Sequence, residues 1–254
     1  MKKNLGGLTF ALALVAATSL QAATGAELLH TYLVRAQSNS AAFDITYNFV
    51  VDVQALGKTS YEQSSLRSVG GDAPFVIAQG ASPVKIDVAG NSQCVKQGED
   101  WQCHPLSPGQ LTANLANAQM SLYPPTAMTL LAQLIELHPD AVAIAAAGSR
   151  HVAGRDCDSF RVMLNAAQLP REAYPSHLFV RVETDQTTPY VIGTTLDLCF
   201  DRLNGQVLDY QNELVLDQSR MRADGLTSGF SEEAGAVTDS MGTIRARLVA
   251  QRVQ

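Results

Sequence analysis

Residues 196–210 read LDLCFDRLNGQVLDY, which predicts a strand, a tight turn and a second strand. Apolar residues alternate with polar ones on both sides of Asn204-Gly205, and Asn-Gly readily takes the positive φ that a hairpin turn needs. A second strand-like segment, residues 152–162, carries Cys157, while Cys199 lies in the quoted stretch. A disulfide between two such strands would indicate a β-sheet protein from an oxidising compartment.

The chain has four cysteines, and we favour the pairs Cys94–Cys103 and Cys157–Cys199. A Gly-Glu-Asp turn would bring the first two together, although four cysteines allow three pairings and the sequence alone does not decide. A zinc site is the alternative, but no Cys-x-x-Cys occurs and only His104 lies beside a cysteine. We therefore expect disulfides, with no metal and no cofactor.

Residues 1–26 resemble an export signal, with two lysines near the start, an apolar run over 8–17 and a small-residue cleavage site at 24–26. An uncleaved N-terminal anchor is the alternative, but the run is shorter than the roughly 20 residues of a spanning helix. We expect export to the periplasm or the extracellular space, and a soluble mature chain of residues 27–254.

The charge of the chain limits its partners. The loss of Lys2 and Lys3 with the signal takes the formal net charge from −6 to −8. This charge argues against nucleic acid as a partner, and against electrostatic docking on anionic lipid headgroups.

The periodicity of the mature chain predicts many strands and few helices. Residues 27–40 predict an amphipathic helix, and residues 43–52 alternate between apolar and polar side chains in the clearest strand pattern of the chain. Further strand-like segments are 75–78, 84–88, 93–96, 101–104, 141–146, 150–152, 157–164, 178–183, 190–200, 206–216 and 243–253. Residues 222–242 predict a loop or a partly ordered insert.

A helical insert at about 108–138 interrupts the strands. Ser107 would cap a first helix, with Pro108 in its first turn and Gln110 three residues after the cap. A second helix follows Pro124-Pro125 and is apolar around much of its circumference. We expect a mainly β (α+β) protein with one antiparallel sheet covered by a helical lid, and favour a two-domain division less.

A lid over the apolar face of a curved sheet can enclose a ligand cavity or a filled core. The expected lining residues are Phe43, Ile45, Tyr47 and Phe49 from the strand, with Met128, Leu131, Leu134 and Ile135 from the lid. Such a stripe of apolar residues at helical spacing is more often core than ligand site.

The sequence contains no recognisable catalytic motif. Gly-x-Ser-x-Gly is absent, and the five histidines show no His-x-His or His-x-x-x-His spacing. We therefore expect a protein that is not an enzyme.

Three segments carry a family resemblance: residues 26–29 entering the first helix, residues 152–157, and residues 199–208. With the order of helix, strands, helical insert and returning strands, they resemble the lipoprotein-carrier superfamily of the bacterial envelope. That group includes outer-membrane lipoprotein chaperones, mycobacterial lipid-carrier lipoproteins and an envelope-stress regulator. The resemblance implies an open β half-barrel, closed by helices, that holds acyl chains or a lipidated peptide. No catalytic residues are shared, and this chain lacks the acylated cysteine of many members.

The sequence therefore predicts an exported, non-enzymatic carrier of a lipid or another hydrophobic ligand over residues 27–254. A membrane or envelope protein would be the partner that receives the ligand. The alternative is a regulatory or scaffold module that has the same fold with a filled core and binds another protein.

Overall fold

The computed structural model describes residues 25–36, 43–55, 58–79, 83–107, 110, 124–165, 168–169, 191–223 and 241–254. Four predictions therefore fall wholly or mostly outside the described residues: the export signal, the body of the first insert helix, the strand at 178–183 and the loop at 222–242. Gln110 is described, and it forms the predicted cap: its backbone N–H donates to Ser107 Oγ (3.3 Å), and its Oε1 accepts from the Ser107 N–H (2.9 Å).

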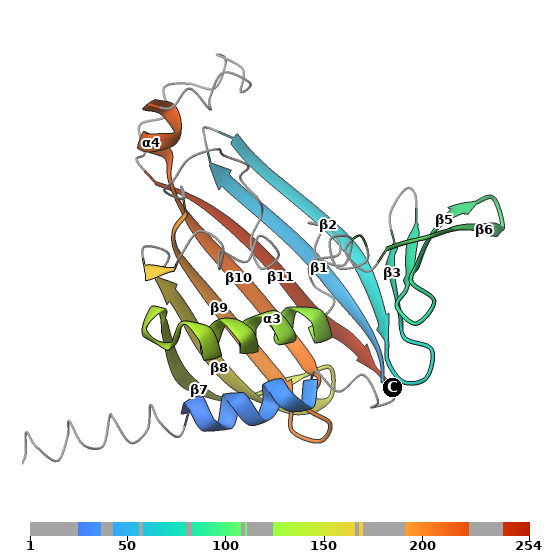
Figure 1. Ribbon diagram of the computed structural model, residues 1–254, viewed down its shortest axis with the longest axis horizontal. Helices are drawn as coiled ribbons and strands as arrows, with labels where there is room; N and C mark the ends of the chain where they lie inside the picture. The colour runs from blue at the N-terminus through green and yellow to red at the C-terminus, as the bar shows by residue number, and fades with distance from the viewer. Residues whose placement is uncertain are drawn as a thin grey trace, which may run out of the picture.

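One antiparallel sheet of eleven strands dominates the structure and is not closed into a barrel (Figure 1). The strands are β1 (Asp44–Ala55), β2 (Lys58–Val69), β3 (Phe75–Gln79), β4 (Val84–Asp87), β5 (Ser92–Gln97), β6 (Asp100–Pro105), β7 (Val142–Val152), β8 (Arg155–Asn165), β9 (Val191–Asp201), β10 (Val207–Asp217) and β11 (Met241–Val253). The helices are residues 25–36, α3 (Pro124–Leu137), α4 (Gln218–Ala223) and a 3-10 turn at Pro139–Ala141. This confirms the predicted fold class.

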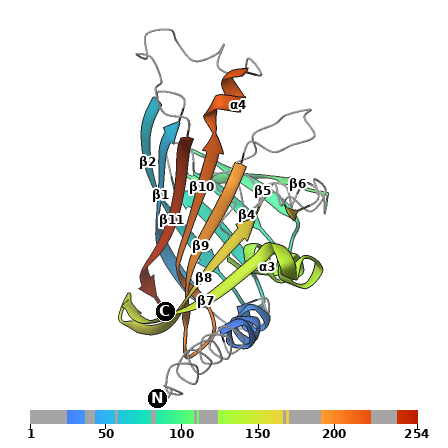
Figure 2. The same ribbon diagram turned by 90° about the vertical axis from the view of Figure 1, so that its left-hand side faces the viewer.

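The order of the strands explains the helical insert. The sheet runs β6-β5-β4-β3-β2-β1-β11-β10-β9-β8-β7, so the chain builds one wing outward from β1 to β6 and the other inward from β7 to β11. The connection from β6 must therefore pass from one edge of the sheet to the other, and this connection contains α3. Helix 25–36 and α3 both lie over the inner face of the curved sheet (Figures 1 and 2).

The inner face of the sheet is apolar because alternate side chains point to the same side. One row runs in register across five neighbouring strands, and all of its members are buried: Phe49, Leu248, Tyr210, Leu198 and Phe160. The outer face carries ion pairs instead, such as Arg161 with Asp197 (2.8 Å) and Arg247 with Asp209 (2.9 Å). This division produces the alternating sequence pattern.

The structure joins the cysteines in the pairs that the sequence favours. The sulfur atoms are 2.08 Å apart in Cys94–Cys103 and 2.03 Å apart in Cys157–Cys199. The first pair connects the edge strand β6 to its neighbour β5, and the second connects β8 to β9.

The turn between β9 and β10 shows why the Asn-Gly sequence is there. Gly205 has a φ of 76°, and Asn204 Oδ1 accepts a hydrogen bond from the Gln206 N–H (3.0 Å). A side chain at position 205 would also lie 2.7 Å from Cβ of Arg35, at the end of helix 25–36. Glycine therefore permits both the turn and the close approach of the helix.

Candidate functional site

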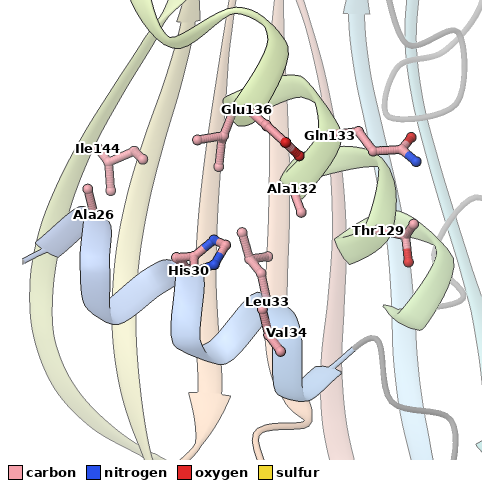
Figure 3. A pocket seen from close by; sticks show the side chains of 10 residues that line it. Ala26, His30, Leu33, Val34, Thr129, Ala132, Gln133, Glu136 and Ile144 are labelled. Carbon is pink, nitrogen blue, oxygen red and sulfur yellow. The ribbon is translucent and has the colours of Figure 1, made fainter.

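The candidate site lies between helix 25–36 and α3, beside strand β7 and next to the core. Each helix divides its residues between two faces. Toward the core, helix 25–36 buries Leu29 and Tyr32, and α3 buries Met128 and Leu131. The adjacent faces of the two helices turn toward each other (Figure 3).

A pocket of about 450 Å³ separates these faces. Its lining comes from three elements: Ala26, His30, Leu33 and Val34 of helix 25–36; Thr129, Ala132, Gln133, Ile135 and Glu136 of α3; and Ile144 of β7 (Figure 3). The volume lies within the range of about 300–1,000 Å³ that is usual for small-molecule sites.

The pocket has an apolar interior and a polar mouth. Leu33, Ala132, Ile135 and Ile144 are buried or half-buried, and Thr129 is the one polar side chain among the half-buried lining. The exposed lining is polar apart from Val34: His30, Gln133 and Glu136. His30 of helix 25–36 and Glu136 of α3 lie on the two helical sides of the pocket (Figure 3). Such a lining suits a ligand with an apolar body and a polar end, which it can bind without a chemical step.

One hydrogen-bonded cluster fixes helix 25–36 to the sheet. The Tyr32 hydroxyl donates to Asp158 Oδ2 on β8 (2.8 Å), and Asp158 Oδ1 accepts from Arg202 Nε (2.8 Å) and from Ser149 Oγ (3.0 Å). Burial alone would raise the pKa of Asp158, but the hydrogen bonds from Arg202, Tyr32 and Ser149 outweigh it and lower that pKa. Burial and the bond to Asp158 raise the pKa of Tyr32 to about 12.

Aromatic packing completes this attachment. The Tyr32 ring stacks on Phe200 with centroids 5.2 Å apart and lies 5.8 Å from the Phe160 centroid. Helix 25–36 is therefore a firmly positioned wall of the pocket.

Of the eight residues that the sequence places in a ligand cavity, the structure puts Ile135 in the pocket. The other seven lie in the buried core, each at most 5% exposed: Phe43, Ile45, Tyr47, Phe49, Met128, Leu131 and Leu134. Tyr47 also donates a hydrogen bond from its hydroxyl to the carbonyl of Val207 (2.7 Å). All seven side chains belong to the hydrophobic core cluster.

Sequence reasoning missed most of the pocket because its lining is chemically mixed. Ala132, Gln133 and Glu136 do not belong to the apolar stripe of α3, and His30 is on the polar side of helix 25–36. One feature of the sequence could have indicated the pocket. Apolar residues surround more of α3 than a helix with a single packed face requires.

Within the described ranges, no group of three histidine, cysteine or acidic side chains is arranged to hold a metal ion. Among the described helices, none has both the length and the apolar character for a membrane span.

Comparison with known proteins finds no matching family model and no similar curated protein sequence. Among solved structures, the lipoprotein LppX of Mycobacterium tuberculosis is 10% identical, with a TM-score of 0.39 over 87% of this chain and 93% of LppX. LprF of Mycobacterium bovis is also 10% identical, with a TM-score of 0.38 over 87% and 91% of the two chains.

The complex of MucA and MucB from Pseudomonas aeruginosa is 16% identical, with a TM-score of 0.40, over 89% of this chain and 56% of that chain. This chain therefore spans little more than half of the matched chain in that complex. A LolA superfamily protein from Nitrosomonas europaea also matches, with 8% identity and a TM-score of 0.26 over 85% of this chain and 90% of that chain.

Proposed function

We propose that this chain is a non-enzymatic carrier or binding protein that holds the apolar part of a lipid, a lipidated peptide or a similar ligand between helix 25–36 and α3. The observation that carries the proposal is the pocket of about 450 Å³ with an apolar interior and a polar mouth. The ligand would place its apolar part against Leu33, Ile135 and Ile144 and its polar end near His30 and Glu136.

Burial of apolar surface would supply the affinity. Each Å² of apolar area removed from water contributes about 25 cal/mol, so one acyl chain could contribute several kcal/mol before the entropy loss of binding. We propose that the seven core residues predicted as cavity lining lie behind the pocket and could contact a longer ligand. Such a ligand could reach them only if α3 moved away from the core.

Uptake and release would need helix 25–36 and α3 to separate. The bonds of Tyr32 fix the first helix to β8, so α3 is the better candidate for the moving wall. A membrane or envelope protein that binds the ligand more tightly would then shift the ligand from this protein to itself.

We also propose that the protein works outside the cytoplasm, in the periplasm or the extracellular space. The signal-like residues 1–26 support this location, and so do two disulfides, because such bonds persist in oxidising compartments.

The test uses two substitutions on α3. Ala132→Trp fills the pocket, whereas Leu137→Trp adds the same side chain at a position that is 71% exposed. Binding of N-phenyl-1-naphthylamine and of oleate is measured by fluorescence and by displacement. We expect the parent and Leu137→Trp to bind and Ala132→Trp to lose at least tenfold in affinity. Equal affinity in all three proteins would disprove the pocket as the site.

The filled inner face supports a second candidate, the protein-binding regulatory or scaffold module. Seven predicted cavity residues are buried core residues, so the fold does not need a ligand to fill it. One measurement distinguishes the carrier from the protein-binding module. The protein is purified without detergent and incubated with phospholipid, and a solvent extract of it is analysed by mass spectrometry. A stoichiometric lipid supports the carrier, and an empty extract supports the module.

A further inference from the structure

The mouth of the pocket carries a negative charge that its own lining does not neutralise. Among the described residues that line the pocket, Glu136 is the only one with a fixed charge, because none is a lysine or an arginine and His30 counts as neutral at pH 7. Glu136 is exposed, and it forms no ion pair in the part of the chain that the structure describes. The formal charge of the lining is therefore −1.

The nearest cations along the chain are directed away from the pocket. Its three elements, helix 25–36, α3 and β7, contain two arginines and no lysine, and neither arginine is part of the lining. The Arg35 guanidinium lies 5.9 Å from the ring centroid of Tyr32, the side chain that packs against the sheet. Arg150 Nη1 donates to Asp209 Oδ2 (2.9 Å) on the outer face of the sheet. A ligand in the pocket would thus meet the carboxylate without a neighbouring arginine.

Helix α3 places further oxygen acceptors in line with this carboxylate. Thr129, Gln133 and Glu136 follow one another at spacings of four and three, which puts them on one face of the helix, and all three line the pocket (Figure 3). Side chains at such spacings have Cβ atoms about 5–6 Å apart, so the Gln133 amide oxygen and the Glu136 carboxylate can accept from the same small group.

These acceptors match one kind of polar group in particular. A primary ammonium has three N–H donors, no acceptor and a positive charge, so it can use both oxygens and also offsets the charge of Glu136. A carboxylate has acceptors only and would meet Glu136 as a like charge. A trimethylammonium group has the charge but no N–H to donate.

We propose that the pocket prefers ligands whose apolar chain ends in a primary ammonium group, as in a long-chain amine or a lipid with an ethanolamine headgroup. This inference rests on the proposed function and specifies the ligand of the same site. The ammonium would bind Gln133 and Glu136, while the chain lies against Leu33, Ile135 and Ile144. An anionic ligand such as oleate would still bind through its chain, but more weakly than the amine of equal length.

The test compares three ligands with the same twelve-carbon chain: dodecylamine, dodecanol and dodecanoate. Each displaces N-phenyl-1-naphthylamine from the parent at pH 7, below the concentration at which it aggregates. We expect dodecylamine to bind about three- to fivefold more tightly than dodecanol, as for an exposed ion pair, and dodecanoate to bind most weakly. The preference for the amine should diminish in 1 M salt, which screens exposed charges.

The variants are compared by the ratio of the dodecanol and dodecylamine dissociation constants within each protein. Glu136→Gln keeps the shape of the side chain and removes its charge, so the ratio should fall toward one. Glu99→Gln makes the same change at an exposed position between β5 and β6, at the opposite edge of the sheet from β7, and should keep the ratio of the parent. Because the ratio is taken within one protein, a general loss of affinity cannot imitate the effect.

A second pair of ligands distinguishes the two sources of the ammonium group. Lysophosphatidylethanolamine and lysophosphatidylcholine share a phosphate and an acyl chain and differ in the methyl groups on nitrogen. Tighter binding of the ethanolamine lipid assigns the site to a phospholipid headgroup. Equal binding of the two, with the preference for dodecylamine intact, assigns it to an amine without phosphate.

Two results would overturn this inference and leave the carrier proposal standing. One is equal affinity of the parent for the three twelve-carbon ligands. The other is a preference for dodecylamine that Glu136→Gln retains, or that Glu99→Gln loses to the same extent, which would show an effect of net charge alone. If the parent bound neither the fluorescent probe nor any of the three ligands, the carrier proposal would fail as well.

Discussion

At the scale of single residues, the contact that matters most for the pocket is the hydrogen bond from Tyr32 to Asp158, because it attaches one wall to the sheet. Tyr32→Phe keeps the ring against Phe200 but removes this bond to a carboxylate. We expect the free energy of unfolding at pH 7 to fall by about 1–2 kcal/mol, as measured by urea denaturation.

The same substitution should change how stability depends on pH. The folded protein lowers the pKa of Asp158, so its stabilising contribution is present above the unfolded value of about 4 and is lost as the pH falls through the folded pKa. Without the Tyr32 bond that pKa rises toward its usual value, and the loss of stability between pH 7 and pH 3 becomes smaller. Tyr47→Phe is the control, because Tyr47 donates to a neutral carbonyl and its loss should cost the same at both pH values. Parallel pH profiles for the parent and Tyr32→Phe would contradict this account.

At the scale of elements, the two disulfides should contribute unequally. Cys157–Cys199 closes a loop with a sequence separation of 42, and Cys94–Cys103 one of 9. By chain entropy the longer loop contributes roughly 4 kcal/mol and the shorter roughly 2.5 kcal/mol. Urea denaturation of Cys157→Ala/Cys199→Ala and Cys94→Ala/Cys103→Ala should show this order. A larger loss from the edge hairpin would mean that loop closure does not set the difference. The parent under reducing conditions should approach the variant that lacks all four cysteines.

Strands and their pairing could be predicted from the sequence wherever one face of the strand is apolar. Residues 43–52 and 196–210 alternate clearly, and they form β1 and the β9–β10 hairpin. The sequence does not predict β2 as one long strand, because its residues, KTSYEQSSLRSV, are mostly polar. This strand forms because it pairs with β1 along its whole length. The segments 141–146 and 150–152 were predicted separately, but a register shift near Gly148 lets one strand, β7, contain both.

The pocket could not be predicted in the same way, because it depends on the relative position of two helices. Periodicity shows which side of a helix is apolar, but it does not show how closely the neighbouring element covers that side. Leu131 and Leu134 meet the sheet and become core, while Ala132 and Glu136, from the same turns of α3, line the pocket. Adjacent residues of α3 can therefore belong one to the core and the other to the candidate site.

At the scale of the whole molecule, the pocket connects segments that are far apart in the sequence. Helix 25–36 precedes the first strand, α3 follows the sixth, and Ile144 belongs to the edge strand of the second wing. A ligand that contacts all three would therefore restrain the crossing connection against both the start of the chain and the sheet.

This arrangement predicts where and how strongly a ligand stabilises the protein. With oleate at about 100 times its dissociation constant, the free energy of unfolding should rise by about 2.7 kcal/mol, or roughly 5–10 °C in thermal midpoint for a domain of this size. Hydrogen exchange should slow in helix 25–36, α3 and the adjacent part of β7, and remain unchanged in the β5–β6 hairpin. Ala132→Trp should show neither effect, since its pocket is filled. If exchange slowed only in the β5–β6 hairpin, the ligand would bind at the sheet edge instead of in the pocket. If oleate slowed exchange equally in the parent and in Ala132→Trp, the ligand would bind outside the pocket.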